Sequence, residues 1–179
     1  MSKIYLINIG ANNAHYSSAR SPRFADGSFV FVPFPWNGAH VRRYPVTCTP
    51  FIRTSRNSTH DDPDWPNLTY GDDCGNGRAG NLRHVTEGDI LLFWGLLWDN
   101  SGNTWAGFTG QKGWYLLGAL RVGDILKGGQ RPTHARAEHI ARARRNVHFR
   151  NGPLPQTHRV FIGDPRYSTL LARSVDFTR

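Results

Sequence analysis

The stretch Thr86-Glu87-Gly88-Asp89-Ile90-Leu91-Leu92-Phe93-Trp94-Gly95 decides the fold. Its first four residues have the composition of a tight turn, because Gly supplies unusual backbone angles and Asp can bond its own backbone. The run that follows, up to Leu97, has strand length and is apolar on both faces, which indicates a central strand. Residues 114–122, WYLLGALRV, come after a turn-rich segment and are the expected partner strand. The sequence therefore predicts a β-hairpin in the middle of a sheet.

Further elements are expected on both sides of this hairpin. Residues 3–10 (KIYLINIG) and 28–35 (SFVFVPFP) read as strands, the second limited by two prolines. Turn formers dominate from about 36 to 80, which predicts a long loop. The remaining expected elements are a basic helical segment at about 134–146, a short strand at 159–162 and a short helix at 168–173.

Strands at both ends, a central hairpin and helices confined to connections are typical of an α+β barrel rather than of a doubly wound sheet. The chain has 179 residues, enough for one hydrophobic core, so we expect a single domain over residues 1–179. Cys48 and Cys74 lack metal-ligand spacing, which favours two reduced thiols. The absence of a long apolar run predicts a cytoplasmic protein that makes no membrane contact.

The charge balance indicates the class of partner. The chain has 22 Lys and Arg against 13 Asp and Glu, a formal net charge of +9. Such a field attracts polyanions and weakens with salt, so nucleic acid is the expected partner. A GC-rich genome that encodes arginine freely would produce the same excess, and lysine is indeed limited to Lys3, Lys112 and Lys127.

Several segments, taken in order, resemble PUA-like domains of the EVE, YTH and ASCH type. The segments are Leu82 to Asp89, the two hairpin strands, TYGD at 69–72 and VFIGDPRYSTLL at 160–171. Over nearly the whole chain the sequence is most similar to the nucleotide-modification-associated domain families, which are proposed to contact modified nucleic acids. The resemblance implies a small mixed β-barrel flanked by short helices. It also implies recognition of a modified or flipped base. DNA is favoured over RNA as the polymer, with RNA left open, and a separately encoded modification or restriction enzyme is a further candidate partner.

The resemblance also suggests which side chains bind a base. A stacked base needs aromatic rings, and its edge needs groups that donate and accept hydrogen bonds. The residues expected to form this site are Asn8, Gly10, Asn12, Tyr70, Asp72 and Trp94. Plain core packing of Trp94 is an equally open reading, and a hydrogen bond from Asn8 to a neighbouring loop is the more common use of such a residue.

A second set of residues has the chemistry to contact phosphate. The members are Ser21, Arg23, Arg142, Arg144, Arg145, Arg166 and Ser168. Arginine forms bidentate contacts with phosphate oxygens, and hydroxyls add hydrogen bonds. Each arginine could instead be a solvated surface residue.

The acidic stretch His60 to Cys74, HDDPDWPNLTYGDDC, has three readings. It is a structural loop held by its prolines and by Asx turns, a base-reading segment that uses Tyr70 and Asp72, or a site of metal or acid/base chemistry at His60, Asp61, Asp62 and Asp64. The structural loop is favoured, because turn formers dominate and calcium-loop spacing is absent. We therefore expect no metal.

No known catalytic pattern appears in the sequence. There is no GxSxG or deaminase motif, and no P-loop or GxGxxG follows an expected strand. We therefore expect a binding module without a cofactor. The alternative is a hydrolase or glycosylase that acts on an extruded nucleotide, with Asp72 as base and Tyr70 as stacking partner.

Overall fold

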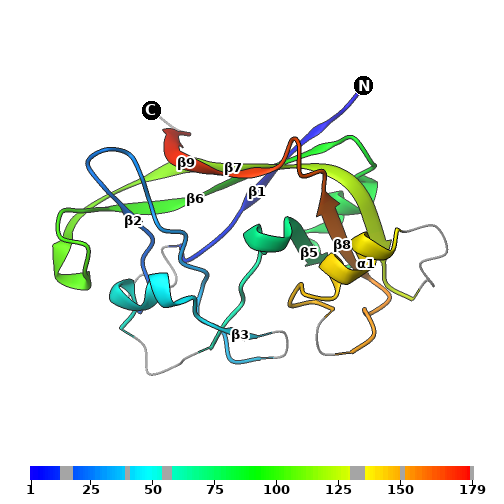
Figure 1. Ribbon diagram of the computed structural model, residues 1–179, viewed down its shortest axis with the longest axis horizontal. Helices are drawn as coiled ribbons and strands as arrows, with labels where there is room; N and C mark the ends of the chain where they lie inside the picture. Colours follow the sequence, from blue (N-terminus) through cyan, green and yellow to red (C-terminus); the bar gives the residue numbers. More distant parts are fainter. Residues whose placement is uncertain (13–17, 39–40, 54–57, 130–135, 150–151, 178–179) are drawn as a thin grey trace. The chain divides into compact units, whose positions relative to one another are not determined.

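The computed structural model describes residues 1–12, 18–38, 41–53, 58–129, 136–149 and 152–177 (Figure 1). The strands are β1 (Ile4–Asn8), β2 (Pro22–Arg23), β3 (Arg42–Arg43), β4 (Ser58–Thr59), β5 (Thr69–Asp73), β6 (Ile90–Asn100), β7 (Phe108–Lys127), β8 (His158–Gly163) and β9 (Thr169–Asp176). The helices are the 3₁₀ helices η2 (Val46–Phe51), η3 (Trp65–Asn67), η4 (Gly80–His84) and η5 (Trp105–Gly107), and the α-helix α1 (Ala137–Ala143).

Most of these strands belong to one mixed sheet. Its order is β1-β6-β7-β8-β5, with β2 paired to β6 and β9 paired to β7. β2 runs parallel to β6, whereas β8 runs antiparallel to both β5 and β7. Within the described residues the helices are short, and α1 packs against β8 (Figure 1). The fold is a mixed sheet with few helices, in agreement with the expected α+β class.

The turn before β6 forms as its sequence predicts. Asp89 Oδ2 accepts hydrogen bonds from the backbone N–H and the hydroxyl of Thr86, at 2.9 and 3.0 Å. Asp89 Oδ1 accepts the N–H of Lys3 at 2.8 Å. Gly88 has φ +87°, a conformation that residues with a Cβ rarely adopt. The predicted strands at 90–97 and 114–122 are confirmed as parts of β6 and β7, which both extend further.

Three local predictions differ from the structure. Residues 28–35 form only isolated bridges at Phe29 and Pro35, because Pro33 and Pro35 lack the N–H groups that a ladder needs. The predicted helix at 168–173 is the strand β9, since pairing with β7 outweighs a weak helix propensity. In its described residues, the predicted loop at 36–80 contains β3, η2, β4, η3 and β5, and η4 begins at Gly80. Of the basic segment at 134–146, α1 is the α-helical part, and residues 134 and 135 lie outside the described residues.

The chain divides into two compact units. The first unit comprises Met1–Leu6, Asp62–Leu92 and Ala119–Thr169, and the second comprises Ile7–Asp61, Phe93–Gly118 and Leu170–Arg179. In the first unit a buried apolar cluster consists of Leu126, Ala143, Leu154, Val160 and Ile162. In the second unit a buried cluster consists of Ala11, Ala19, Val32, Cys48 and Phe51. The single domain over residues 1–179 stays a prediction.

Candidate functional site

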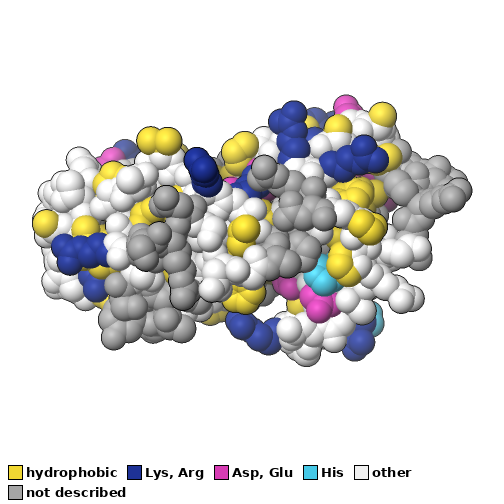
Figure 2. Space-filling view, turned by 90° about the horizontal axis from the view of Figure 1, so that it is seen from below, with side chains coloured by type: hydrophobic (Ala, Val, Ile, Leu, Met, Phe, Trp, Pro, Cys, Tyr) yellow, Lys and Arg dark blue, Asp and Glu magenta, His cyan; other side chains and the backbone are white. Residues whose placement is uncertain are grey.

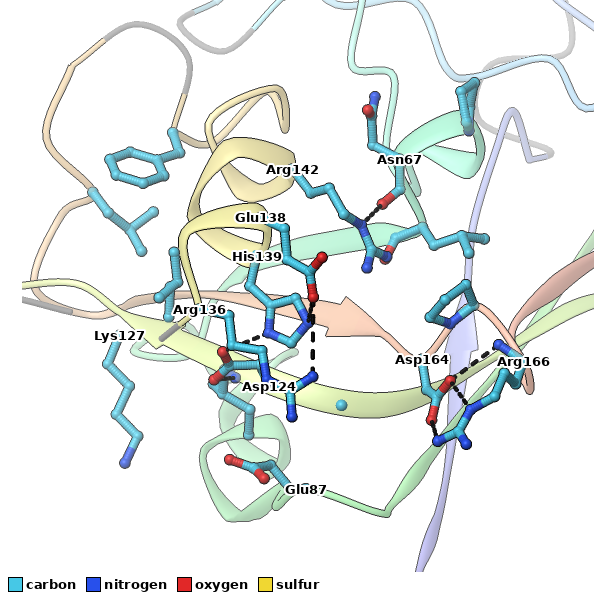
Figure 3. A pocket seen from close by; sticks show the side chains of 18 of the residues that line it. Asn67, Glu87, Asp124, Lys127, Arg136, Glu138, His139, Arg142, Asp164 and Arg166 are labelled. Atoms are coloured by element: carbon cyan, nitrogen blue, oxygen red, sulfur yellow. Dashed lines mark hydrogen bonds and ion pairs between the residues drawn. The ribbon is translucent and has the colours of Figure 1, made fainter. Parts of the chain in front are cut away.

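The first unit contains a pocket of about 1300 Å³ (Figure 3). It is lined by the last part of β7, by α1, by η3 and by the turn that follows β8. Leu68, Ile125, Phe149 and Leu154 give it an apolar part. Its charged lining consists of Glu87, Asp124, Glu138 and Asp164 together with Lys127, Arg136, Arg142 and Arg166. An apolar hollow with a few convergent polar groups is the usual form of a small-molecule site.

One acidic residue of β7 and one of the turn after β8 line this pocket. The register of β7 against β8 shifts between Val122 and Asp124. A bulge of this kind redirects the side chain that follows it. The intervening Gly123 lies against the turn after β8, because an added Cβ there would be in ordinary van der Waals contact, 3.4 Å, with the backbone N of Asp164. Asp124 and Asp164 therefore line the same pocket although 40 positions separate them in the sequence.

A histidine and a carboxylate form a close pair in the pocket. His139 Nδ1 lies 2.8 Å from Asp124 Oδ2, and the two side chains are only 14% and 17% exposed. His139 Nε2 faces Glu138 Oε1 at 3.7 Å (Figure 3). A carboxylate on Nδ1 fixes the orientation of the imidazole, so Nε2 is the nitrogen that can exchange a proton or a hydrogen bond with a ligand.

Arg142, a predicted phosphate ligand, binds backbone carbonyl groups. Its Nε donates to the carbonyl oxygen of Asn67 at 2.8 Å, and its Nη2 donates to those of Leu68 and Gly163 at 3.2 and 2.8 Å. Burial lowers the pKa of the guanidinium. Arg142 thus joins α1 to the end of η3 and to the end of β8, and its contacts make it a structural member of the pocket wall.

Arg166, also predicted to bind phosphate, is held by a carboxylate. Its Nη2 and Nε donate to the two oxygens of Asp164 at 2.9 and 3.2 Å. These bonds lower the pKa of Asp164 to about 2. Two guanidinium groups lie near the ring of the exposed Tyr167. The distance from the ring centroid is 4.7 Å to the guanidinium carbon of Arg121 and 5.3 Å to that of Arg166. The Tyr167 ring in the turn after β8 therefore contacts one guanidinium from β7, that of Arg121, and one from its own turn, that of Arg166, which lines the pocket.

Two aspartates of the acidic stretch have structural contacts in the first unit. Asp62 is 4% exposed, and its oxygens accept Asn146 Nδ2 at 2.8 Å and the N–H of Gly71 at 2.9 Å. Asp64 precedes η3 and accepts both the backbone N–H and the side-chain amide of Asn67. Asp64 thus closes a local turn on its own segment, whereas Asp62 binds residues that lie 9 and 84 positions away. The structural reading of the acidic stretch stays a prediction.

The remaining two residues considered as metal ligands have contacts in the second unit. His60 stacks on Phe34 with ring centroids 5.3 Å apart, and Asp61 pairs with Arg42 at 3.5 Å. The expectation of no metal stays a prediction.

Tyr70 and Asp72, two predicted base-binding residues, contact each other. The hydroxyl of Tyr70 donates to Asp72 Oδ2 at 2.6 Å. Tyr70 is 7% exposed, stacks on Phe161 at 6.3 Å, and has a pKa raised well above its usual value by burial. Both residues belong to the first unit but do not line its large pocket.

The other four predicted base-binding residues lie in the second unit. Asn8 Nδ2 donates to the carbonyl oxygen of Trp94 at 3.4 Å. Trp94 is partly buried against Trp114 and Phe177, with ring centroids 5.0 and 5.1 Å away. Gly10 has φ +75° and packs closely against Phe31, and Asn12 is partly buried. The structure thus brings Asn8 to Trp94, and separately Tyr70 to Asp72.

The other predicted phosphate ligands are dispersed. Ser21 is buried and its hydroxyl accepts the N–H of Val32, and Arg23 contacts Asp99 and Ser174. Ser168 is buried and accepts the N–H of Arg121 at 3.1 Å. Arg144 and Arg145 are exposed after α1. Within the described chain, only Arg142 and Arg166 of this set line the large pocket.

Sequence reasoning missed Asp124, His139, Lys127, Arg136 and Glu138 as pocket residues. One signal was present, because His139 and Arg142 are three residues apart and so share a face of the expected helix. Nothing local pairs His139 with Asp124. Their contact depends on the packing of α1 over the sheet.

The surface agrees with a basic protein. On the face drawn in Figure 2, Lys and Arg side chains stand in several separate groups, with few acidic side chains between them. None of the described helices is long and apolar enough to span a membrane.

One comparison identifies the family of the chain. Residues 3–174 match the family model described as nucleotide modification associated domain 3. No curated protein and no solved structure is significantly similar to the chain. The family associates the chain with nucleic-acid modification systems. Because the match covers nearly all of the sequence, the protein belongs to the nucleotide modification associated domain 3 family.

Proposed function

We propose that the protein recognises a nucleotide of modified nucleic acid, and that the pocket of the first unit holds it. The observation that carries the proposal is this pocket, which combines an apolar part with cations and with the oriented His139–Asp124 pair. Its volume of about 1300 Å³ exceeds that of a typical small-molecule site, so a nucleotide fits with part of the flanking strand.

The lining has the groups that a nucleotide needs. Leu154 and Phe149 offer apolar surface to a base, and the imidazole of His139 offers a hydrogen bond to its edge. Arg136 has a side chain that is 78% exposed, and its ion pair within the described residues is a 4.0 Å contact with Glu138, so phosphate can compete for it. Arg166 is less available, because Asp164 already neutralises its charge.

The proposal keeps the finer expectations that the sequence raised. The mixed sheet is compatible with a PUA-like barrel, in which a flipped base would be read. DNA is the favoured polymer, a separately encoded modification or restriction enzyme is the expected protein partner, and the cytoplasm is the expected location. Asn8, Gly10, Asn12, Tyr70, Asp72 and Trp94 stay predicted base contacts, and they are an alternative to the pocket.

The test compares two single arginine variants with the same change in charge. Arg136→Ala removes a pocket arginine at the start of α1, and Arg144→Ala removes an exposed arginine at its end that does not line the pocket. We expect modified DNA oligonucleotides to bind with a steep salt dependence. Arg136→Ala should weaken binding about tenfold, and Arg144→Ala should weaken it much less.

Three results would contradict this proposal. Equal effects of Arg136→Ala and Arg144→Ala would mean that the oligonucleotide is attracted only by the net positive charge of the protein and not by the pocket. A loss of binding in Tyr70→Phe or Trp94→Leu, with binding by His139→Gln unchanged, would mean that the base binds near Tyr70 or near Trp94 instead of in the pocket. Absence of binding even at low salt would remove nucleic-acid recognition altogether.

A second candidate function is hydrolysis of the bound nucleotide, and the His139–Asp124 geometry favours it. The sequence suggested Asp72 as base, but Asp72 Oδ2 accepts the Tyr70 hydroxyl and Oδ1 accepts the N–H of Asp73. His139 Nε2 could instead take a proton from water while the water oxygen bonds to the sugar C1′ carbon. The bond from C1′ to the base breaks, and the base leaves with its electron pair and takes a proton from solvent.

Chromatography of the products distinguishes this reaction from binding alone. The wild-type protein should release free base from a modified oligonucleotide, and His139→Gln should bind that oligonucleotide without releasing it. Binding with no release by the wild-type protein would leave recognition as the function and remove the glycosylase.

A further inference from the structure

The second unit contains a line of side chains in which cations and aromatic rings alternate. In order, it consists of Lys112, Trp98, Arg20, Trp105 and Arg53, and we refer to it as the cation–aromatic ladder. The Nζ of Lys112 lies 4.6 Å from the centroid of the Trp98 ring. The guanidinium carbon of Arg20 lies 4.5 Å from Trp98 and 4.8 Å from Trp105, and that of Arg53 lies 5.0 Å from Trp105.

Hydrogen bonds to the backbone fix the segment that carries Trp105. Trp105 begins η5 in the connection between β6 and β7, where Asn100 Nδ2 donates to the carbonyl oxygen of Thr104 at 2.8 Å and Asn100 Oδ1 accepts the N–H of Gly102 at 3.0 Å. Trp105 also packs edge-on to Phe108 with ring centroids 5.5 Å apart. Trp105, one member of the ladder, is therefore carried by a connection whose backbone is fixed by hydrogen bonds.

The ladder concentrates positive charge that is open to solvent at both ends. Lys112 and Arg53 are exposed, Arg20 and Trp105 are partly buried, and Trp98 is 5% exposed. Each indole face attracts a cation, which offsets the repulsion among three cations placed so close together. An approaching polyanion would gain from all three charges at once.

We propose that the cation–aromatic ladder is a contact site for single-stranded nucleic acid. Proteins that hold single strands combine cations for the phosphates with flat groups on which bases stack. Arg53 supplies both at the open end of the ladder, because a guanidinium stacks on a base and also pairs with phosphate. A single strand is the fitting partner because its bases are free to stack on the protein, whereas the bases of a duplex are already paired and stacked on one another.

This site lies in the second unit and the nucleotide pocket lies in the first, so the two can be tested separately. The proposal shares with the proposed function only the class of polymer. An unmodified oligothymidylate tests the ladder, since it carries phosphates and stackable bases and no modification. A free modified mononucleotide tests the pocket, since it is too short to depend on the ladder.

The experiment measures fluorescence anisotropy of labelled oligothymidylate at several salt concentrations. Arg53→Ala should weaken binding about tenfold and lower the slope of log affinity against log salt by about 0.7, the value for one phosphate contact on a single strand. Arg53→Lys should keep that slope but still weaken binding, because Lys keeps the charge and loses the planar group. Lys112→Ala should lower the slope with a smaller loss of affinity.

The matched control is Arg43→Ala, which removes an exposed arginine of the second unit outside the ladder. Effects of Arg43→Ala equal to those of Arg53→Ala would overturn the proposal. So would a fall in melting temperature in Arg53→Ala without any change in binding, which would make the ladder a support for the connection between β6 and β7. Equal loss of duplex binding would also overturn the single-strand assignment. If mononucleotide binding is absent while oligothymidylate binding behaves as expected, the proposed pocket fails and the ladder stands.

Discussion

Arg142 donates a 2.8 Å hydrogen bond to the carbonyl oxygen of Gly163, which ties α1 to the last residue of β8. The same guanidinium binds the carbonyl oxygens of Asn67 and Leu68. A side chain that the sequence presents as one of several helix arginines is therefore a clamp between three segments of the pocket wall. Removal of the Arg142 side chain is therefore expected to lower the stability of the fold, whether or not a ligand is bound.

Arg142→Ala should lower the free energy of unfolding by about 2 to 4 kcal/mol, because three carbonyl groups lose a charged donor in a partly buried place. Arg144→Ala is the control, since Arg144 is exposed and surface changes usually stay within about 0.5 kcal/mol. Urea unfolding of the two variants measures the difference. Equal stability of both variants would show that Arg142 has no clamping role.

Gly71→Ala should destabilise the first unit. An added Cβ at Gly71 would lie 2.5 Å from His148 Cδ2 and 2.7 Å from Asn146 Oδ1, two groups of the network around Asp62. Overpacking of this kind costs about 1 to 3 kcal/mol. Gly77→Ala is the matched control because a Cβ there meets nothing within 4 Å. Thermal unfolding that ranks the two variants equally would contradict the close approach of His148 to β5.

The carboxyl group of Asp164 should titrate near pH 2 in the folded protein. Its bonds from Arg166 lower its pKa from 3.8 to about 2. Since the folded-state pKa is the lower one, the interaction stabilises the fold at pH values above about 4 and is lost as the pH falls from about 4 to about 2. Carboxyl carbon NMR measures the midpoint. Arg166→Gln should return it towards 3.8, and an unchanged midpoint in that variant would mean that the pair does not form in solution.

Both thiols should react slowly in the folded protein. Cys48 and Cys74 are free and buried, and burial raises their pKa values to about 12 and about 11. The thiolate, which is the reactive form, is therefore scarce at neutral pH. A colorimetric disulfide reagent should label both cysteines quickly in denaturant and only slowly under native conditions. Rapid labelling of the native protein would contradict this burial.

The local signals in the sequence predict structure reliably where the hydrogen bonds and apolar contacts of a segment are made within that segment. The turn 86–89 closes on its own aspartate, and the apolar runs on either side of the following connection form β6 and β7. The acidic stretch also follows local rules at Asp64, which caps η3. Residues 168–173 show the limit of such signals, because β9 exists through its pairing with β7 and not through its own propensity.

The sequence by itself determined the α+β class, the central hairpin, the basic character of the protein and the family resemblance, since these depend on composition and on short-range patterns. Only the tertiary structure decided that His139 meets Asp124, that Arg142 binds carbonyl oxygens, and that Lys112, Trp98, Arg20, Trp105 and Arg53 form one ladder. The physical reason is that these contacts join residues far apart in the chain. Their geometry depends on the register of β7 with β8, on the packing of α1 and on the path of the connection before β7, and no short segment encodes any of these.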